Sequence, residues 1–67
     1  MIMIQRLSKM SSGNYVECVV VNTPELSYKY QIYEIVNGVT QKKQYRKTVT
    51  AALKTQRRVF GGERWHN

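Results

Sequence analysis

Acidic side chains are scarce in this sequence. Four Asp and Glu residues stand against eleven Lys and Arg residues, and none of the four lies between residues 35 and 62. The four are Glu17, Glu25, Glu34 and Glu63. They are scattered along the chain and show neither the spacing of a metal-binding loop nor a paired arrangement for acid–base chemistry. We therefore expect no metal site and no catalytic carboxylate pair.

Cysteine and histidine each occur once, as Cys18 and His66. A single thiol excludes an internal disulfide, and one histidine beside it does not complete a zinc site. A catalytic thiol needs a neighbouring base or a helix start, so we expect Cys18 to be a small core residue. The sequence also lacks a glycine-rich phosphate loop. We expect no cofactor and no enzymatic activity.

Long hydrophobic runs are missing too. The apolar start, residues 1–7, is short and is interrupted by Gln5 and Arg6. It is too short for a signal peptide, and no stretch approaches the roughly 20 apolar residues of a membrane span. We expect a cytoplasmic protein with a reduced thiol. Hydrophobic residues nevertheless make up 42% of the chain, which favours a folded mini-domain over residues 1–62, with 63–67 as a tail.

Two turn signals, at residues 11–14 and 22–24, enclose a β-branched run over residues 15–21. The continuous apolar end of this run is typical of a central strand that is covered on both faces. Residues 1–7 form a second candidate strand, which the first turn would bring alongside it.

A third strand is predicted over residues 28–36, ending at Asn37-Gly38, a strong signal for a two-residue hairpin turn. Regular pairing beyond that turn would put Tyr30 opposite Tyr45 on the more apolar face. We therefore interpret these two tyrosines as packing residues.

The same pairing puts Tyr33 opposite Lys42 on the other face, beside Lys29 and Arg46. Tyrosine beside cations offers a stacking plane for an unpaired base. Tyr33 is the one tyrosine that we expect to contact a ligand.

The last element is predicted to be a helix that starts after a Thr48 cap and stops at Gly61-Gly62 in a left-handed conformation. One helix face carries an apolar stripe, and Gln56 lies on the same face. The stripe consists of Val49, Ala52, Leu53, Val59 and Phe60. A longer helix from about residue 41 to 60 is the alternative. It is disfavoured because Lys42 and Lys43 would stand at the positive end of the helix dipole.

The net charge of +7 lies entirely in residues 39–67, because the charges of residues 1–38 cancel. A one-sided charge costs stability through self-repulsion, so it needs an explanation. We favour binding to a polyanionic partner over the alternative, a charged face that only keeps the protein in solution. The cations expected to bind are Lys42, Lys43, Arg46, Lys47, Lys54, Arg57 and Arg58.

These features predict an α+β fold: a small antiparallel sheet of three to four strands with one C-terminal helix packed on one face. The function they favour is non-catalytic nucleic-acid binding, with RNA or another single strand preferred to duplex DNA, because no helix-turn-helix or zinc-finger signature is present. The strand–turn–strand–helix order over about residues 15–60 resembles, in topology alone, the arm-type DNA-binding domains of phage integrases.

A different class of function is the alternative: a small inhibitor or adaptor, of the kind found in phages and mobile elements, that binds a host enzyme or toxin. In that case Arg64 and Trp65 in the tail are candidates for the protein interface. A homodimer is compatible with both functions, because the apolar residues 1–4 could pair across a sheet edge.

Overall fold

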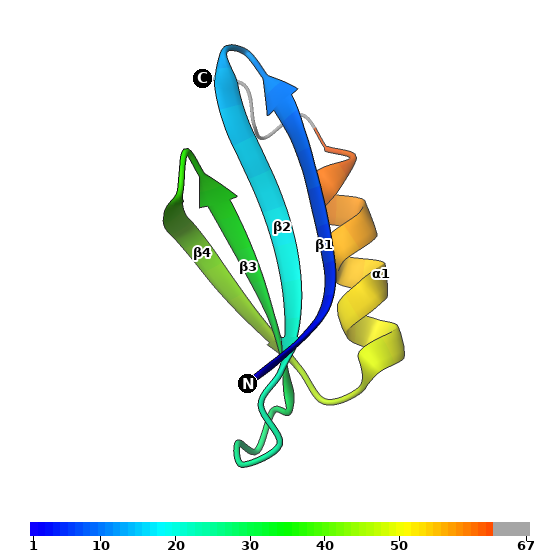
Figure 1. Ribbon diagram of the computed structural model, residues 1–67. Coiled ribbons are helices and arrows are strands. Elements are labelled where there is room, and N and C mark those ends of the chain that lie inside the picture. Colours follow the sequence, from blue (N-terminus) through cyan, green and yellow to red (C-terminus); the bar gives the residue numbers. More distant parts are fainter. Residues whose placement is uncertain (63–67) are drawn as a thin grey trace.

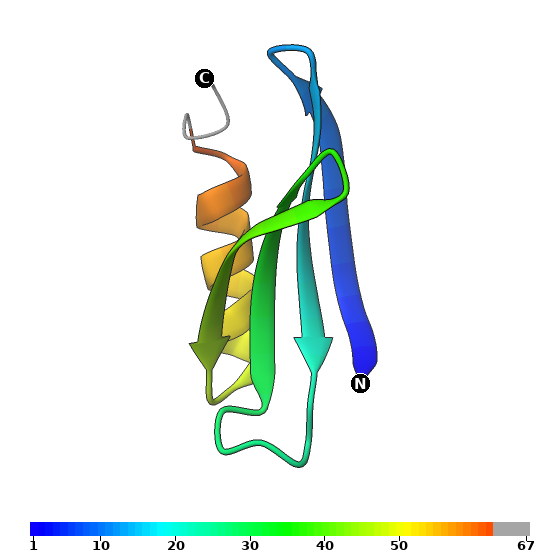
Figure 2. The ribbon, with the colours of Figure 1, turned by 90° about the vertical axis from the view of Figure 1, so that its left-hand side faces the viewer.

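The computed structural model describes residues 1–62 and shows the predicted α+β fold (Figure 1). Its elements are β1 (Ile2–Ser11), β2 (Asn14–Asn22), β3 (Tyr30–Val36), β4 (Val39–Arg46) and α1 (Val49–Phe60). The strands form one antiparallel sheet in the order β1-β2-β3-β4. Helix α1 packs against one face of the sheet, and no described element covers the other face (Figure 2). Within residues 1–62, no helix is long and apolar enough to cross a membrane.

Two tight turns join the strands in pairs. Ser12 and Gly13 connect β1 to β2 with φ of 52° and 81°, and Asn37 and Gly38 connect β3 to β4 with φ of 49° and 83°. Positive φ at both central positions is what a type I′ hairpin turn requires, and asparagine and glycine adopt it at low cost. The turns predicted at residues 11–14 and 37–38 are confirmed.

The core lies between α1 and the sheet. Val16, Cys18 and Val20 of β2 meet Ile32 of β3, and Ala52 and Val59 of α1 complete the cluster. Cys18 is therefore a core residue, as predicted. Leu53 and Phe60 of the apolar stripe pack at the rim of this cluster, whereas Val49, in the first turn of the helix, is exposed.

Strand β2 is buried on both faces, as its sequence predicted. Val19 and Val21 point away from α1, yet their side chains are only 5% and 4% exposed. Their neighbours in the sheet shield them, because Val19 lies between Arg6 of β1 and Tyr33 of β3 in the pairing register.

Helix α1 begins and ends where the sequence predicted, but the conformation at its C-terminal end differs. The Thr48 side chain accepts a hydrogen bond from the Ala51 N–H at 3.2 Å, so the shorter helix is correct and residues 39–46 form a strand. The expected left-handed end is wrong. Gly61 has φ −82°, and its N–H donates a hydrogen bond to the Arg57 carbonyl at 3.1 Å. Gly61 therefore keeps the right-handed helical conformation.

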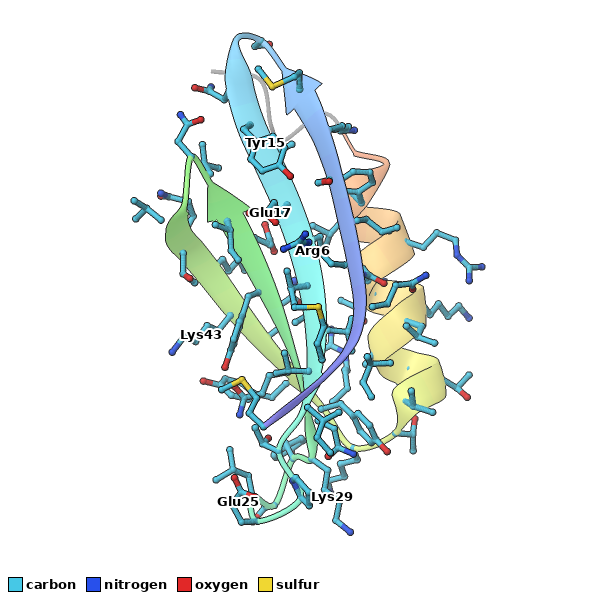
Figure 3. The ribbon with its side chains drawn as sticks, viewed as in Figure 1. Arg6, Tyr15, Glu17, Glu25, Lys29 and Lys43 are labelled. Atoms are coloured by element: carbon cyan, nitrogen blue, oxygen red, sulfur yellow. The ribbon has the colours of Figure 1, made fainter. Side chains whose placement is uncertain are left out.

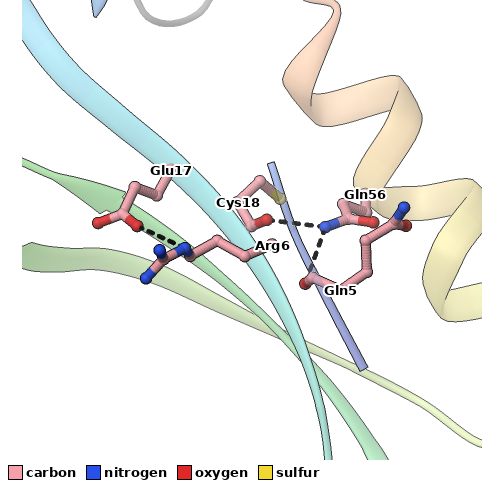
Figure 4. Close-up of polar contacts among 5 residues, drawn as sticks. All are labelled: Gln5, Arg6, Glu17, Cys18 and Gln56. Carbon is pink, nitrogen blue, oxygen red and sulfur yellow. Dashed lines mark hydrogen bonds and ion pairs between the residues drawn. The ribbon is translucent and has the colours of Figure 1, made fainter. Parts of the chain in front are cut away.

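Gln56 joins the helix to the sheet (Figure 4). Its side chain is 1% exposed, and its Nε2 donates to the carbonyl of Cys18 at 2.7 Å and to that of Gln5 at 3.2 Å. One amide group thus connects α1 to two adjacent strands. Lys9 of β1 adds a second link, because its ammonium donates to the Phe60 carbonyl at 2.8 Å.

Candidate nucleic-acid interface

A β-bulge in β4 determines which side chains face which side of the sheet. Ile35 pairs with Thr40, but Glu34 pairs with Lys42, so Gln41 has no partner in β3. An extra residue in one strand moves every later side chain to the opposite face. The pairings expected from regular alternation are therefore wrong from Gln41 to the end of β4.

The bulge changes the roles of the tyrosines. Tyr33 pairs with Lys43 rather than Lys42, and the Lys43 ammonium lies 5.4 Å from the centre of the Tyr33 ring. Tyr45 pairs with Gln31 instead of Tyr30 and is 45% exposed on the face away from α1, so its assignment to the core is wrong. Tyr30 packs against the core, as predicted.

Arg46 turns toward α1 and bonds to the protein itself. Its Nε donates to Thr55 Oγ1 at 3.0 Å, and its two terminal nitrogens donate to the Tyr45 carbonyl at 2.7 Å and to Gln44 Oε1 at 3.1 Å. These bonds hold the end of β4 against the helix. The expected place of Arg46 beside Tyr33 is therefore wrong, and its role in the structure is to anchor β4.

Three of the predicted cations form the outer surface of α1. Lys54, Arg57 and Arg58 are exposed, whereas Ala52, Thr55, Gln56 and Val59 of the same helix are buried. Thr55, which Arg46 contacts, marks the side of the helix that faces β4. Arg58 follows it by three residues and so lies on that same side.

The lysines of β4 are divided between the two faces of the sheet. Lys42 lies on the side of α1, Lys43 lies on the opposite side, and both are exposed. Lys47 follows the strand, with its ammonium 5.3 Å from the centre of the Tyr28 ring. Because β4 is an edge strand, its two adjacent lysines place positive charge on both sides of that edge.

The sheet face opposite α1, here called the open face, carries a row of four paired residues across the strands: Arg6, Val19, Tyr33 and Lys43. Figure 3 labels Arg6 and Lys43, which lie at the two ends of this row. Glu17 is the one acidic side chain on this face among the described strands. Its carboxylate lies 3.5 Å from the Arg6 guanidinium (Figure 4). Glu17 thus lies beside Arg6, and Lys43, next to Tyr33, has no acidic neighbour on that row.

Sequence reasoning missed Tyr45 and Arg6 as residues of an exposed surface. No apolar alternation runs through residues 40–46, so nothing in the sequence of β4 specifies its register against β3. Arg64 and Trp65, the predicted protein-interface candidates, lie outside the described residues. Within residues 1–62, no group of three His, Cys, Asp or Glu side chains is placed to hold a metal ion.

Comparisons with protein-family models, with curated proteins and with solved structures gave no match to this chain.

Proposed function

We propose that the protein is a non-catalytic nucleic-acid-binding protein that prefers RNA to duplex DNA. The observation that carries the proposal is the grouping of exposed cations on the outer surface of α1 and along the neighbouring edge strand β4. No acidic residue interrupts the chain between residues 35 and 62. A surface that served solubility alone would mix the two signs of charge.

Phosphate capture explains why these cations are useful together. Each phosphate that a protein neutralises releases condensed counterions, so several exposed cations give an affinity that falls steeply with salt. Arg57 and Arg58 can each bind a phosphate through two parallel N–H groups, whereas Lys42 and Lys54 act as point charges. Arg46 supports this surface indirectly by holding β4 against α1.

Charge reversal on α1 tests the proposal. We expect the double variant Arg57→Glu, Arg58→Glu to bind a labelled single-stranded RNA at least ten-fold more weakly at low salt. We also expect the slope of log affinity against log salt to decrease by about two, one for each lost phosphate contact. Fluorescence anisotropy over a salt series measures both, and unlabelled duplex DNA should compete less well than unlabelled RNA.

Lys29→Glu is the matched control for the single variant Arg57→Glu. Lys29 is an exposed cation in the connection between β2 and β3, and its reversal changes the net charge by as much as either single reversal on α1. It should leave the slope nearly unchanged. Equal losses for Lys29→Glu and Arg57→Glu would mean that only net charge matters. Absence of RNA binding by the wild-type protein at low salt would refute the proposal and favour the inhibitor or adaptor function.

The proposal includes self-association at the opposite edge of the sheet. Residues 1–4 are apolar and exposed, and β1 is an edge strand of ten residues. A second copy can pair there without opposing cations, because Arg6 lies beside Glu17 and Lys9 bonds to the Phe60 carbonyl. The lysines of β4 would repel a copy at the other edge. We place nucleic-acid binding by this protein in the cytoplasm, where the thiol of Cys18, which forms no disulfide, stays reduced.

A further inference from the structure

We infer that the open face is a stacking platform for unpaired bases, formed by Tyr33 and Tyr45 with Lys43 beside both. This inference rests on the proposed function and specifies its ligand as a single strand whose bases are unstacked. It assigns a role to Tyr45 that regular strand pairing had excluded.

Hydrogen bonds hold the Tyr33 ring in place before any ligand arrives. Its hydroxyl donates to Gln31 Oε1 at 2.5 Å, and Gln31 Nε2 in turn donates to Thr23 Oγ1 at 3.1 Å. Gln31 is only 6% exposed, and its bond to Thr23 is buried, so the inner part of this chain of contacts is shielded from water. A ring that is already fixed loses little conformational entropy when a base covers it.

Tyr45 provides the second ring. It is 45% exposed and lies two residues after Lys43 on the same face of β4. Tyr33 pairs with Lys43, so Tyr33 and Tyr45 are diagonal neighbours across the two strands. Lys43, whose ammonium lies 5.4 Å from the Tyr33 ring centre, can move from that ring to a phosphate beside the bound bases.

The diagonal placement of Tyr33 and Tyr45 selects against a duplex. Diagonal neighbours in an antiparallel pair lie about 7–8 Å apart. Successive bases in a duplex strand are stacked about 3.4 Å apart and leave no face free for a side chain. Two neighbouring bases can cover both rings only when the strand is unpaired and its bases are separated.

The open face is also connected to the cations of α1. Lys42 and Lys43 are adjacent in β4 and lie on opposite sides of the sheet, so a strand that crosses this edge meets positive charge on both sides. Phosphate capture by α1 and base stacking on the open face can then act on one bound strand.

Comparing a strand that has bases with one that lacks them distinguishes base stacking from phosphate binding. The probes are a fluorescein-labelled twelve-nucleotide oligouridine and an abasic strand of the same length and charge. We expect the wild-type protein to bind oligouridine about ten-fold more tightly than the abasic strand, because stacking on an aromatic side chain contributes to each base contact. Tyr45→Ala should reduce this difference several-fold, because only the Tyr33 ring remains, and Tyr45→Phe, which keeps the ring, should preserve it.

Tyr28→Ala is the matched control. Tyr28 is 47% exposed but lies in the connection before β3, so its loss should leave the ratio of the two affinities unchanged. Equal binding of both probes by the wild-type protein would overturn the platform and leave the proposed function standing. Binding of neither probe would overturn both. A change from dimer to monomer on Tyr45→Ala, without an effect on the ratio, would show that a second copy covers this face instead.

Discussion

At the scale of single residues, a buried polar side chain joins the helix to the sheet beside the small apolar core. The core cluster contains six buried residues, and Gln56 is buried beside them. A buried amide is favourable only when its hydrogen bonds are made, and Gln56 makes two with strand carbonyls. Its position within the apolar stripe of the helix was visible in the sequence, but its partners were not.

Replacement of Gln56 tests this anchoring role. We expect Gln56→Leu to lower the free energy of unfolding by about 1–3 kcal/mol, since two buried hydrogen bonds are lost without a large change in side-chain volume. Urea denaturation followed by circular dichroism measures the change. Gln41→Leu, at an exposed glutamine, is the control and should stay within about 0.5 kcal/mol of wild type. Equal effects of the two substitutions would contradict the role assigned to Gln56.

At the scale of elements, the bulge in β4 is the feature on which the candidate interface depends. Because Gln41 has no partner in β3, Lys43 and Tyr45 join the open face and Arg46 reaches Thr55 of the helix. Without the bulge these three side chains would exchange sides. The local sequence tolerates either arrangement, whereas the contact of Arg46 with α1 favours the observed one.

Deletion of single glutamines from β4 distinguishes the two arrangements. Deleting Gln41 removes only the unpaired residue, so the remaining pairs and their faces should persist. Deleting Gln44 shifts Tyr45 and Arg46 to the wrong faces and removes the hydrogen bonds to Glu34 and Thr55.

We expect the Gln44 deletion to be less stable than the Gln41 deletion by about 2 kcal/mol, as measured by chemical denaturation. Both variants lose one glutamine, so the difference reports the shifted register of Tyr45 and Arg46 together with the lost hydrogen bonds of Gln44. A Gln41 deletion that is as unstable as the Gln44 deletion would show that β4 needs the bulge for another reason.

At the scale of the whole molecule, the two edges of the sheet differ in chemistry. The β1 edge begins with four exposed apolar residues, and the β4 edge carries lysines. Under the proposed function, the β1 edge would bind a second copy while the β4 edge would face the nucleic acid. A dimer joined at β1 would extend the open face and keep both β4 edges outermost.

Lysine substitution at the two edges tests the dimer. We expect the wild-type protein to sediment as a dimer in analytical ultracentrifugation at tens of micromolar, and Ile2→Lys to shift it to monomer by placing like charges at the shared edge. Val39→Lys is the control, since Val39 is 61% exposed on β4 and Ile2 is 60% exposed on β1. A wild-type monomer, or the same shift with Val39→Lys, would exclude pairing through β1.

The sequence by itself determined the elements, because their signals are local. Positive-φ residues specify both turns, Thr48 caps the helix, and the β-branched run makes β2 central. Only the tertiary structure decided the faces of β4. A strand without apolar alternation does not specify its own register. The register of β4 is instead favoured by the contact of Arg46 with Thr55, which lies on the helix. Tyr33 was thus predicted beside a lysine from the sequence, whereas the exposed position of Tyr45 on the open face was not.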